Sequence, residues 1–369
     1  MKKVLFTANL DSFFMKFLIP QLKYYKEKGY EVHIASKSQG INIPYCDKKY
    51  DVCFTRSIKI KDIINSYKKI KEILQKNEYE LISCHTPFGA AIPRLAISRI
   101  KNFKTKVIYT AHGFHFYKGA PLINWLIYYP MEKYLSKYTT SIITINDEDY
   151  DIASKKMKCK VYKIHGIGIS KEKFDIKISN DEKKQLYSEL NINKNNFVMI
   201  FPGELNNNKN QKLLIDTVKI LKNRIPELIL LLPGYDLLNG KLQEYAKKHS
   251  VDDYIRFLGY RKDIPQLLRI SNVALSSSKR EGLPINIIEA MYVGVPIVAT
   301  NCRGNRDLIK NEKNGYLVDS YKADEFAEKI YNIYTNKNKT KRFIDINQKE
   351  VNKYMLDSVL KEIIKIYEG

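Results

Sequence analysis

Arginine is scarce in this sequence, although basic residues are abundant. Only 11 of the 63 lysines and arginines are arginine. The planar arginine fork suits bidentate recognition of guanine and phosphate, so its scarcity argues against a dedicated reader of nucleic acid. The formal charge of +23 still favours anionic partners such as nucleotides, lipid headgroups or polyprenyl phosphates. We therefore expect an anion-binding protein with no nucleic-acid partner.

The sequence also lacks paired cysteines and long apolar runs. It contains no CxxC pair and no Cys/His cluster, which favours a reducing compartment and offers no metal site. No window reaches the roughly 18 apolar residues of a membrane-spanning helix. Asn9 and Asp11 interrupt the N-terminal apolar stretch too early for a secretory signal. We expect a cytoplasmic protein, soluble or peripheral on the inner face of the membrane. Its isolated cysteines are Cys46, Cys53, Cys84, Cys159 and Cys302.

Short apolar runs alternate with helical patterns, which is typical of doubly wound parallel sheets. The alternation restarts at residue 197 after a polar segment, 178–196, which we interpret as a connector. We expect an α/β protein with two Rossmann-like domains, residues 1–178 and 179–349. A helix within 345–368 has no following strand, so we expect residues 350–369 to complete the first domain. The expected strands are 4–8, 31–35, 81–84, 106–110 and 141–145, then 197–201, 228–232, 255–258, 273–276, 296–299 and 315–318.

Two helical segments of the first domain combine apolar and basic residues. Residues 57–76 place isoleucines at helical spacing among six lysines, and residues 120–138 combine aromatic and aliphatic residues with Lys133 and Lys137. Such helices suit an anionic bilayer surface. A helix packed on its own sheet with a solvated lysine face explains the same pattern. Both interpretations stay open at this point.

The most informative stretch is SSSKREGLPINIIEAMYVGVPIVAT, residues 276–300. Pro284 suits the first position of a helix that ends near Gly294, so a strand feeds a loop that opens onto a helix N-terminus. Backbone N–H groups and the helix dipole favour a phosphate there. Glu281 and Glu289 are then suited to hydroxyl groups of a ribose or a hexose, because a carboxylate accepts two hydrogen bonds.

At these residues the sequence resembles family 4 glycosyltransferases, which have the GT-B fold. Glu281, Gly282, Pro284 and Glu289 form E-G-x-P-x-x-x-x-E, and GVPIVAT follows. The resemblance covers nearly the whole chain and is to bacterial capsule and exopolysaccharide enzymes. It implies a retaining, metal-independent hexosyltransferase without a cofactor. The donor substrate would be a nucleotide sugar, most simply a UDP-sugar carrying a hexose or N-acetylhexosamine. The acceptor would be lipid-linked or an oligosaccharide.

The resemblance also implies roles for residues of the second domain. Glu289 would bind the donor ribose and Glu281 the transferred sugar, while the loop backbone meets sugar hydroxyls and phosphate. Lys209, in FPGELNNNKNQ, would hold the diphosphate, although Glu204 stands where relatives commonly have arginine. The loop 259–262 would surround the base, with Asp263 capping the next helix. The residues assigned to donor binding are Gly203, Lys209, Tyr260, Arg261, Glu281, Gly282, Leu283, Pro284, Ile285 and Glu289.

In the first domain, the resemblance implies that His112 contacts the transferred sugar, which makes it a third catalytic residue beside Lys209 and Glu281. His85 follows another expected strand and could line the cleft between the two domains. We interpret His115 as structural. Asp11 and Ser12 are acceptor candidates.

Three acids at DxD spacing, Asp147, Asp149 and Asp151, follow an expected strand and open a helix, so we interpret them as helix-start residues rather than metal ligands.

Two other functions are alternatives to a glycosyltransferase. A non-hydrolysing nucleotide-sugar 2-epimerase should lack E-G-x-P-x-x-x-x-E, and a non-catalytic binder of anionic glycans or nucleic acid should not bind UDP.

Overall fold

The computed structural model describes residues 1–54, 60–176 and 178–369, which divide into two compact units. Unit 1 comprises Met1–Ile167 and Asp357–Gly369, and unit 2 comprises Gly168–Leu356. These boundaries differ from the expected 178/179 and 349/350. The reason is a backbone pairing: the N–H of Ile169 donates to the carbonyl of Tyr354 (3.1 Å) and the N–H of Leu356 donates to that of Ile169 (2.9 Å), which ties both segments into unit 2.

Unit 1 is built on a seven-stranded parallel sheet of order β3-β2-β1-β4-β5-β6-β7. All five expected strands are present. The two that were missed, β3 and β7, form the edges and are short, lysine-containing and partly exposed, so they lack the apolar run of a central strand. The strands are β1 (Lys3–Leu10), β2 (Glu31–Lys37), β3 (Lys48–Asp51), β4 (Leu81–His85), β5 (Lys106–Ala111), β6 (Ser141–Thr144) and β7 (Lys160–Lys163).

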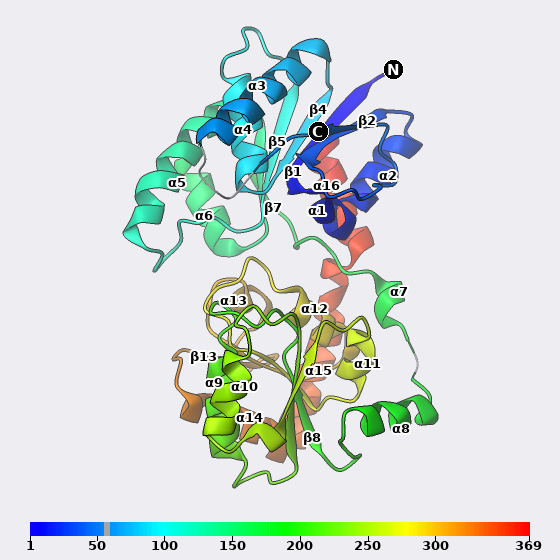
Figure 1. Ribbon diagram of the computed structural model, residues 1–369, viewed down its shortest axis with the longest axis vertical. Helices are drawn as coiled ribbons and strands as arrows, with labels where there is room; N and C mark the ends of the chain where they lie inside the picture. Colours follow the sequence, from blue (N-terminus) through cyan, green and yellow to red (C-terminus); the bar gives the residue numbers. More distant parts are fainter. Residues whose placement is uncertain (55–59, 177) are drawn as a thin grey trace. The chain divides into compact units, whose positions relative to one another are not determined.

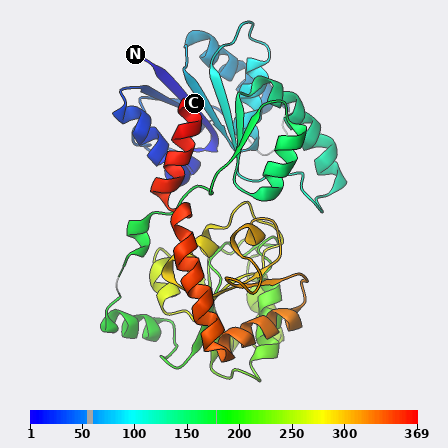
Figure 2. The same ribbon diagram turned by 180° about the vertical axis from the view of Figure 1, so that it is seen from behind.

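Helices cover both faces of this sheet (Figures 1 and 2). One face carries α1 (Asp11–Phe17), α2 (Ile19–Glu27) and, from Asp357 onward, α16 (Leu356–Glu368). Tyr367 of α16 packs against Phe6 and Tyr25 on this face, so the expected return of the C-terminal helix to the first domain is confirmed. The other face carries α3 (Ile60–Lys76), α4 (Pro87–Ile97), α5 (Leu122–Leu135) and α6 (Asp147–Lys156), which share one apolar core. A short 3-10 turn, η1 (Ser136–Tyr138), follows α5.

Unit 2 has a six-stranded parallel sheet of order β10-β9-β8-β11-β12-β13, and all six strands lie where the sequence predicts them. Apolar cores cover both faces. The strands are β8 (Phe197–Ile200), β9 (Leu228–Pro233), β10 (Ile255–Gly259), β11 (Val273–Ser276), β12 (Ile297–Thr300) and β13 (Tyr316–Val318). The helices are α7 (Lys171–Phe174), α8 (Asn180–Glu189), α9 (Gln211–Leu221), α10 (Lys241–Lys248), α11 (Ile264–Arg269), α12 (Ile285–Val293), α13 (Asn305–Leu308), α14 (Ala323–Thr335) and α15 (Lys337–Glu350), with 3-10 turns η2 (Asp252–Tyr254) and η3 (Val351–Tyr354).

Two local expectations were wrong. The polar connector contains α8, whose start is fixed by a capping box: Ser179 Oγ accepts from the N–H of Glu182 (3.1 Å), and the Glu182 carboxylate accepts from the N–H of Ser179 (2.7 Å). The expected helix within 345–368 is interrupted at residues 351–355, where η3 and the pairing of Met355 with Ile169 separate α15 from α16. The beginning of the expected helix 57–76 lies outside the described residues. No helix among the described residues has both the length and the apolarity to cross a membrane.

A buried ion pair joins α4 to α5 in unit 1. Arg94 is completely buried, its Nη2 atom lies 2.9 Å from Oε2 of Glu132, and its guanidinium carbon lies 4.1 Å from the centre of the Tyr109 ring. Removing one partner of such a pair leaves the other as an uncompensated buried charge.

We expect Glu132→Gln to lower the free energy of unfolding by about 3–5 kcal/mol, measured by urea denaturation. The matched control is Glu72→Gln, which removes the carboxylate from an exposed pair with Lys76 and should cost less than about 1 kcal/mol. Equal losses in the two variants would contradict this role for Glu132.

Candidate active site

The strand order of unit 2 reverses between β8 and β11, and the loops that follow these two strands are hydrogen-bonded to each other. The carbonyl of Asn208 accepts from the N–H of Lys279 (2.8 Å), and Asn208 Nδ2 donates to the carbonyl of Arg280 (3.1 Å). Ser277 Oγ donates to the carbonyl of Lys209 (2.7 Å). Parallel α/β sheets bind ligands at this kind of switch point.

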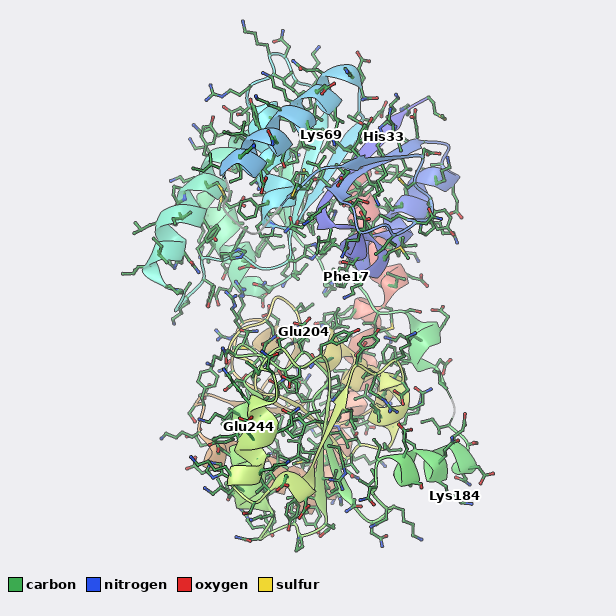
Figure 3. The ribbon with its side chains drawn as sticks, viewed as in Figure 1. Phe17, His33, Lys69, Lys184, Glu204 and Glu244 are labelled. Carbon is green, nitrogen blue, oxygen red and sulfur yellow. The ribbon has the colours of Figure 1, made fainter. Side chains whose placement is uncertain are left out.

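Lys209 and Glu281 meet at this point as an ion pair. Lys209 Nζ lies 2.6 Å from Glu281 Oε1, and the two side chains are 20% and 14% exposed. A Cβ atom on Gly203 would lie 3.4 Å from Cε of Lys209, an ordinary contact distance, so Gly203 lies directly against the lysine chain. Three of the residues predicted for the donor site therefore come together. Glu204, labelled in Figure 3, is exposed on the same loop.

The loop that carries Glu281 rests on the segment that follows β12. Arg303 Nε donates to the carbonyl of Glu281 (3.0 Å), and the N–H of Glu281 donates to the carbonyl of Arg303 (3.1 Å). Gly304 has φ +85°, and a Cβ atom there would lie 2.8 Å from the carbonyl oxygen of Gly282. Both the dihedral angle and the space require glycine at 304. The sequence analysis did not predict that Arg303 and Gly304 contact the Glu281 loop. In the sequence, they are marked only as an Arg-Gly pair that follows a buried strand.

Helix α12 begins directly after this loop. Pro284 is in an extended conformation and precedes the first helical residue, Ile285, one position later than expected. Gly294 ends the helix with φ +85°, as predicted. Asn286 Nδ2 donates to the carbonyl of Pro202 (3.1 Å), which joins the helix start to the loop after β8.

Glu289 lies on the second turn of α12 and is 9% exposed. Burial raises the pKa of its carboxyl group to about 7, while the positive charge of Lys173 acts in the opposite direction. Lys173 Nζ lies 3.8 Å from Glu289 Oε1 and comes from α7. Sequence reasoning missed this lysine, because nothing in the local pattern links residue 173 to residue 289.

Tyr260, predicted to stack on a base, is exposed and stacks on a second exposed tyrosine, Tyr235. Their ring centres are 4.8 Å apart and their planes differ by 9°. Each residue follows a neighbouring strand, β9 or β10, so parallel pairing brings them to the same edge. The sequence contained Tyr235 in a loop after a strand, but nothing marked it as a partner of Tyr260.

Asp263 does not make its predicted cap hydrogen bond, because its carboxylate is paired with Arg261. Arg261 Nε and Nη2 lie 2.8 and 2.6 Å from the two carboxylate oxygens of Asp263, and Nη1 donates to Glu189. Asp263 stands at the cap position of α11, yet its side chain makes no cap hydrogen bond. A forked, charge-assisted pair is stronger than a bond to a neutral N–H, which explains the difference. The hydrogen bonds that Arg261 donates to these two carboxylates raise its pKa.

In unit 1, His112 follows β5 and His85 ends β4. His85 Nδ1 lies 3.3 Å from His112 Nε2, and the rings are stacked with centres 5.6 Å apart. Phe13 contacts both rings. Burial lowers the pKa of His112 to about 4 and that of His85 well below its ordinary value, so both rings are neutral at pH 7. His115 stacks on Tyr128 of α5, with ring centres 4.6 Å apart.

The first loop of unit 1 corrects one expectation. Asp11 is completely buried, and its carboxylate accepts from Ser36 Oγ (2.6 Å) and from the N–H of Gln39 (2.8 Å). It is therefore a structural anchor and not a residue that meets an acceptor. The N–H of Ser12 donates to Oε1 of Gln39 (2.8 Å).

The acids at DxD spacing form the start of α6. Asn146 Oδ1 caps the helix by accepting from the N–H of Asp149 (2.8 Å), and the Asp149 carboxylate accepts from the N–H of Phe114 (3.0 Å). Asp147 pairs with Lys163. The helix-start interpretation is confirmed. Across the described ranges, no group of three or more His, Cys, Asp or Glu residues is placed to hold a metal ion.

Both units match family models. Residues 3–146 match the glycosyl transferase 4-like family, and residues 182–350 match glycosyl transferases group 1. The putative glycosyltransferase EpsD of Bacillus subtilis is 37% identical over 371 residues, an alignment that covers 100% of this chain and 97% of EpsD. The chain belongs to glycosyltransferase family 4.

Two further relatives of this glycosyltransferase are informative. An Escherichia coli UDP-Gal:alpha-D-GlcNAc-diphosphoundecaprenol alpha-1,3-galactosyltransferase is 27% identical over 84% of this chain and 81% of its own length. HepE of Anabaena, solved with UDP and glucose, superimposes with a TM-score of 0.79 at 18% identity, covering 99% of each chain. The predicted GT-B fold class, with two Rossmann-like units, is confirmed.

The buried Glu289 carboxyl group gives this glycosyltransferase a pH-dependent stability. Its pKa is raised from 4.5 to about 7, so the native state binds this proton more tightly than the unfolded state does. The resulting stabilisation is present below about pH 4.5 and is lost as the pH rises through 7. We expect Glu289→Gln to raise the free energy of unfolding at pH 8 by on the order of 3 kcal/mol, with a smaller gain at pH 5.

Urea denaturation at the two pH values measures this difference. Glu244→Gln on α10 removes an exposed glutamate, labelled in Figure 3, and is the matched control. A gain for Glu289→Gln that did not depend on pH would be incompatible with a carboxyl group that titrates in the native state.

Proposed function

We propose that this enzyme is a retaining transferase that moves a hexose or N-acetylhexosamine from a nucleotide sugar, most simply a UDP-sugar. The acceptor is lipid-linked or an oligosaccharide in surface-polysaccharide assembly. The observation that carries the proposal is the Lys209–Glu281 pair beside the helix start at the switch point of unit 2. The E. coli relative is a UDP-Gal-dependent galactosyltransferase and HepE was solved with UDP and with UDP-glucose, which supports a uridine donor.

In this proposal, Lys209 binds the donor diphosphate and leaves Glu281 free to accept hydrogen bonds from the transferred sugar. Glu289 accepts from the ribose diol, and the tyrosines 235 and 260 present a flat face to the base. The exposure of both rings and the burial of Glu289 support these roles. His112 contributes an uncharged imidazole that hydrogen-bonds the sugar.

The transfer breaks the bond between the anomeric carbon and the diphosphate oxygen, and it forms a bond to the acceptor oxygen on the same face. The acceptor proton passes to the departing diphosphate. The negative charge that develops on the leaving group is stabilised by Lys209 and by backbone N–H groups of the loop before α12. The proposed chemistry uses these groups without a bound metal or cofactor.

We expect Lys209→Ala to lower the turnover of a UDP-sugar by roughly 100-fold while weakening UDP binding by less than about tenfold, because charge develops on the leaving group only during reaction. Glu289→Ala should chiefly weaken donor binding. Calorimetric titration with UDP and a transfer assay over a panel of nucleotide sugars measure both effects. Lys212→Ala, an exposed lysine three residues farther on, is the control.

Wild-type rates in Lys209→Ala would refute the leaving-group role. A wild-type protein that fails to bind UDP but retains affinity for anionic glycans or nucleic acid would instead support the non-catalytic binder. Epimerisation of the donor without transfer would support the 2-epimerase.

We also propose that α5 attaches unit 1 to an anionic membrane surface. Four apolar side chains near the start of α5 are exposed by between 52% and 80%. The opposite side of the helix packs against the core of unit 1 through Trp125 and Tyr128. Packing on the protein's own sheet therefore accounts for that side of α5 but not for the exposed apolar side. Lys133 lies near the end of the same helix and Lys137 just after it, and a helix that combines exposed apolar and basic residues suits a lipid interface. The four side chains are Leu122, Ile123, Leu126 and Ile127.

The double variant Leu122→Ser/Leu126→Ser should reduce binding to phosphatidylglycerol vesicles by about tenfold, because two apolar side chains no longer enter the interface. Vesicle co-sedimentation measures the change. Leu237→Ser removes an exposed leucine from unit 2 and should have no effect. Undiminished sedimentation of the double variant would exclude α5 as the contact.

A further inference from the structure

The two charged groups of the Lys209–Glu281 pair depend on each other for hydrogen bonding. Lys209 Nζ lies 2.6 Å from Glu281 Oε1, and the two side chains are only 20% and 14% exposed. Within residues 1–54, 60–176 and 178–369, Lys209 is the one hydrogen-bond donor to this carboxylate, and Glu281 is the one acceptor for this ammonium group. Each charge is therefore compensated chiefly by the other, and both are largely shielded from water.

The backbone is fixed on both sides of this pair. The carbonyl of Lys209 accepts from Ser277 Oγ (2.7 Å), and the N–H and carbonyl groups of Glu281 are both hydrogen-bonded to Arg303. A Cβ atom on Gly304 would lie 2.8 Å from the Cβ atom of Glu281, so the base of the glutamate side chain is held against this glycine. The pair can therefore open by side-chain rotation, and the long, flexible lysine chain has more freedom to do so than the shorter glutamate.

An anion that binds to Lys209 has to take the place of the Glu281 carboxylate. When a diphosphate carries a sugar, the sugar hydroxyls can donate to Glu281, so both charged groups obtain new partners. A diphosphate without a sugar supplies a partner for Lys209 alone. It leaves the Glu281 carboxylate without a donor and close to a second anion. A shielded charge that loses its partner is costly, so the two ligands should differ in affinity.

We propose that the Lys209–Glu281 pair makes this enzyme prefer the intact donor to the nucleoside diphosphate that remains after transfer. Glu281 competes with the diphosphate for Lys209, and the sugar hydroxyls of an intact donor relieve this competition. After transfer the ion pair re-forms, which favours release of the diphosphate product. The preference rests on the proposed function of the two residues, whereas the competition between the carboxylate and an anion at Lys209 does not.

Calorimetric titration of Glu281→Gln tests this preference with UDP, with uridine and with a UDP-sugar that serves as donor. Glutamine keeps the shape of the side chain but removes the competing charge, so we expect UDP to bind about tenfold more tightly than to the wild type. The affinity for the UDP-sugar should change by less than about threefold, because its hydroxyls lose a charged acceptor at the same time. Uridine has no phosphate and should bind equally to both proteins.

Two further variants separate competition from a general effect of charge. Glu204→Gln removes an exposed carboxylate from the loop that carries Lys209 and should change the affinity for UDP by less than about twofold. In a Lys209→Ala background, Glu281→Gln should no longer tighten UDP binding, because the carboxylate then has no ammonium group to compete for. Glu281→Ala replaces Glu281→Gln if urea denaturation shows that the glutamine variant is unfolded.

An unchanged affinity of Glu281→Gln for UDP would overturn the proposal. So would equal tightening in Glu204→Gln, or the same tightening in the Lys209→Ala background. Titration with inorganic pyrophosphate separates the proposal from the proposed function. If the wild type bound neither UDP nor any UDP-sugar, the proposed function would fail, and tighter pyrophosphate binding by Glu281→Gln would still support competition at Lys209. Unchanged pyrophosphate binding in that case would overturn both.

Discussion

The contact between the loops after β8 and β11 is the constraint on which the rest of unit 2's site depends. The side chains of Asn208 and Ser277 donate hydrogen bonds to backbone carbonyls of the opposite loop and align the loops, and the Lys209–Glu281 pair joins them. Because the carboxylate holds the ammonium group in place, the cation is already oriented at the sheet edge. A charge-assisted bond at this partly buried position is stronger and more directional than a surface pair. In the proposed function, Lys209 exchanges this carboxylate for the donor diphosphate.

A third strand end makes this arrangement rigid. The segment after β12 supports the Glu281 loop through Arg303 and through the absence of a side chain at Gly304. Three strand ends, those of β8, β11 and β12, thus contribute to one small surface. Positions of side chains in such a surface are set by parallel pairing of the strands, which is why loops of an α/β sheet hold functional groups accurately.

The sequence predicted what depends on apolar patterning and missed what depends on distant pairing. All six strands of unit 2 were predictable because each carries an apolar run; five are entirely buried, and the edge strand β10 is partly buried. Edge strands β3 and β7 were not, since their lysines lack an apolar run, and α8 was concealed by its polar composition. The local motif identified Glu281 and Lys209 separately. Their contact across 72 residues, and that of Lys173 with Glu289, required the fold.

The energetic cost of burying a polar group differs between the two units. Glu289 lies where burial disfavours its charge, so it lowers stability at neutral pH. In unit 1, Ser83 and His85 are buried polar residues that occupy positions where apolar side chains would pack more simply. Because each has a hydrogen-bond partner, their burial costs little.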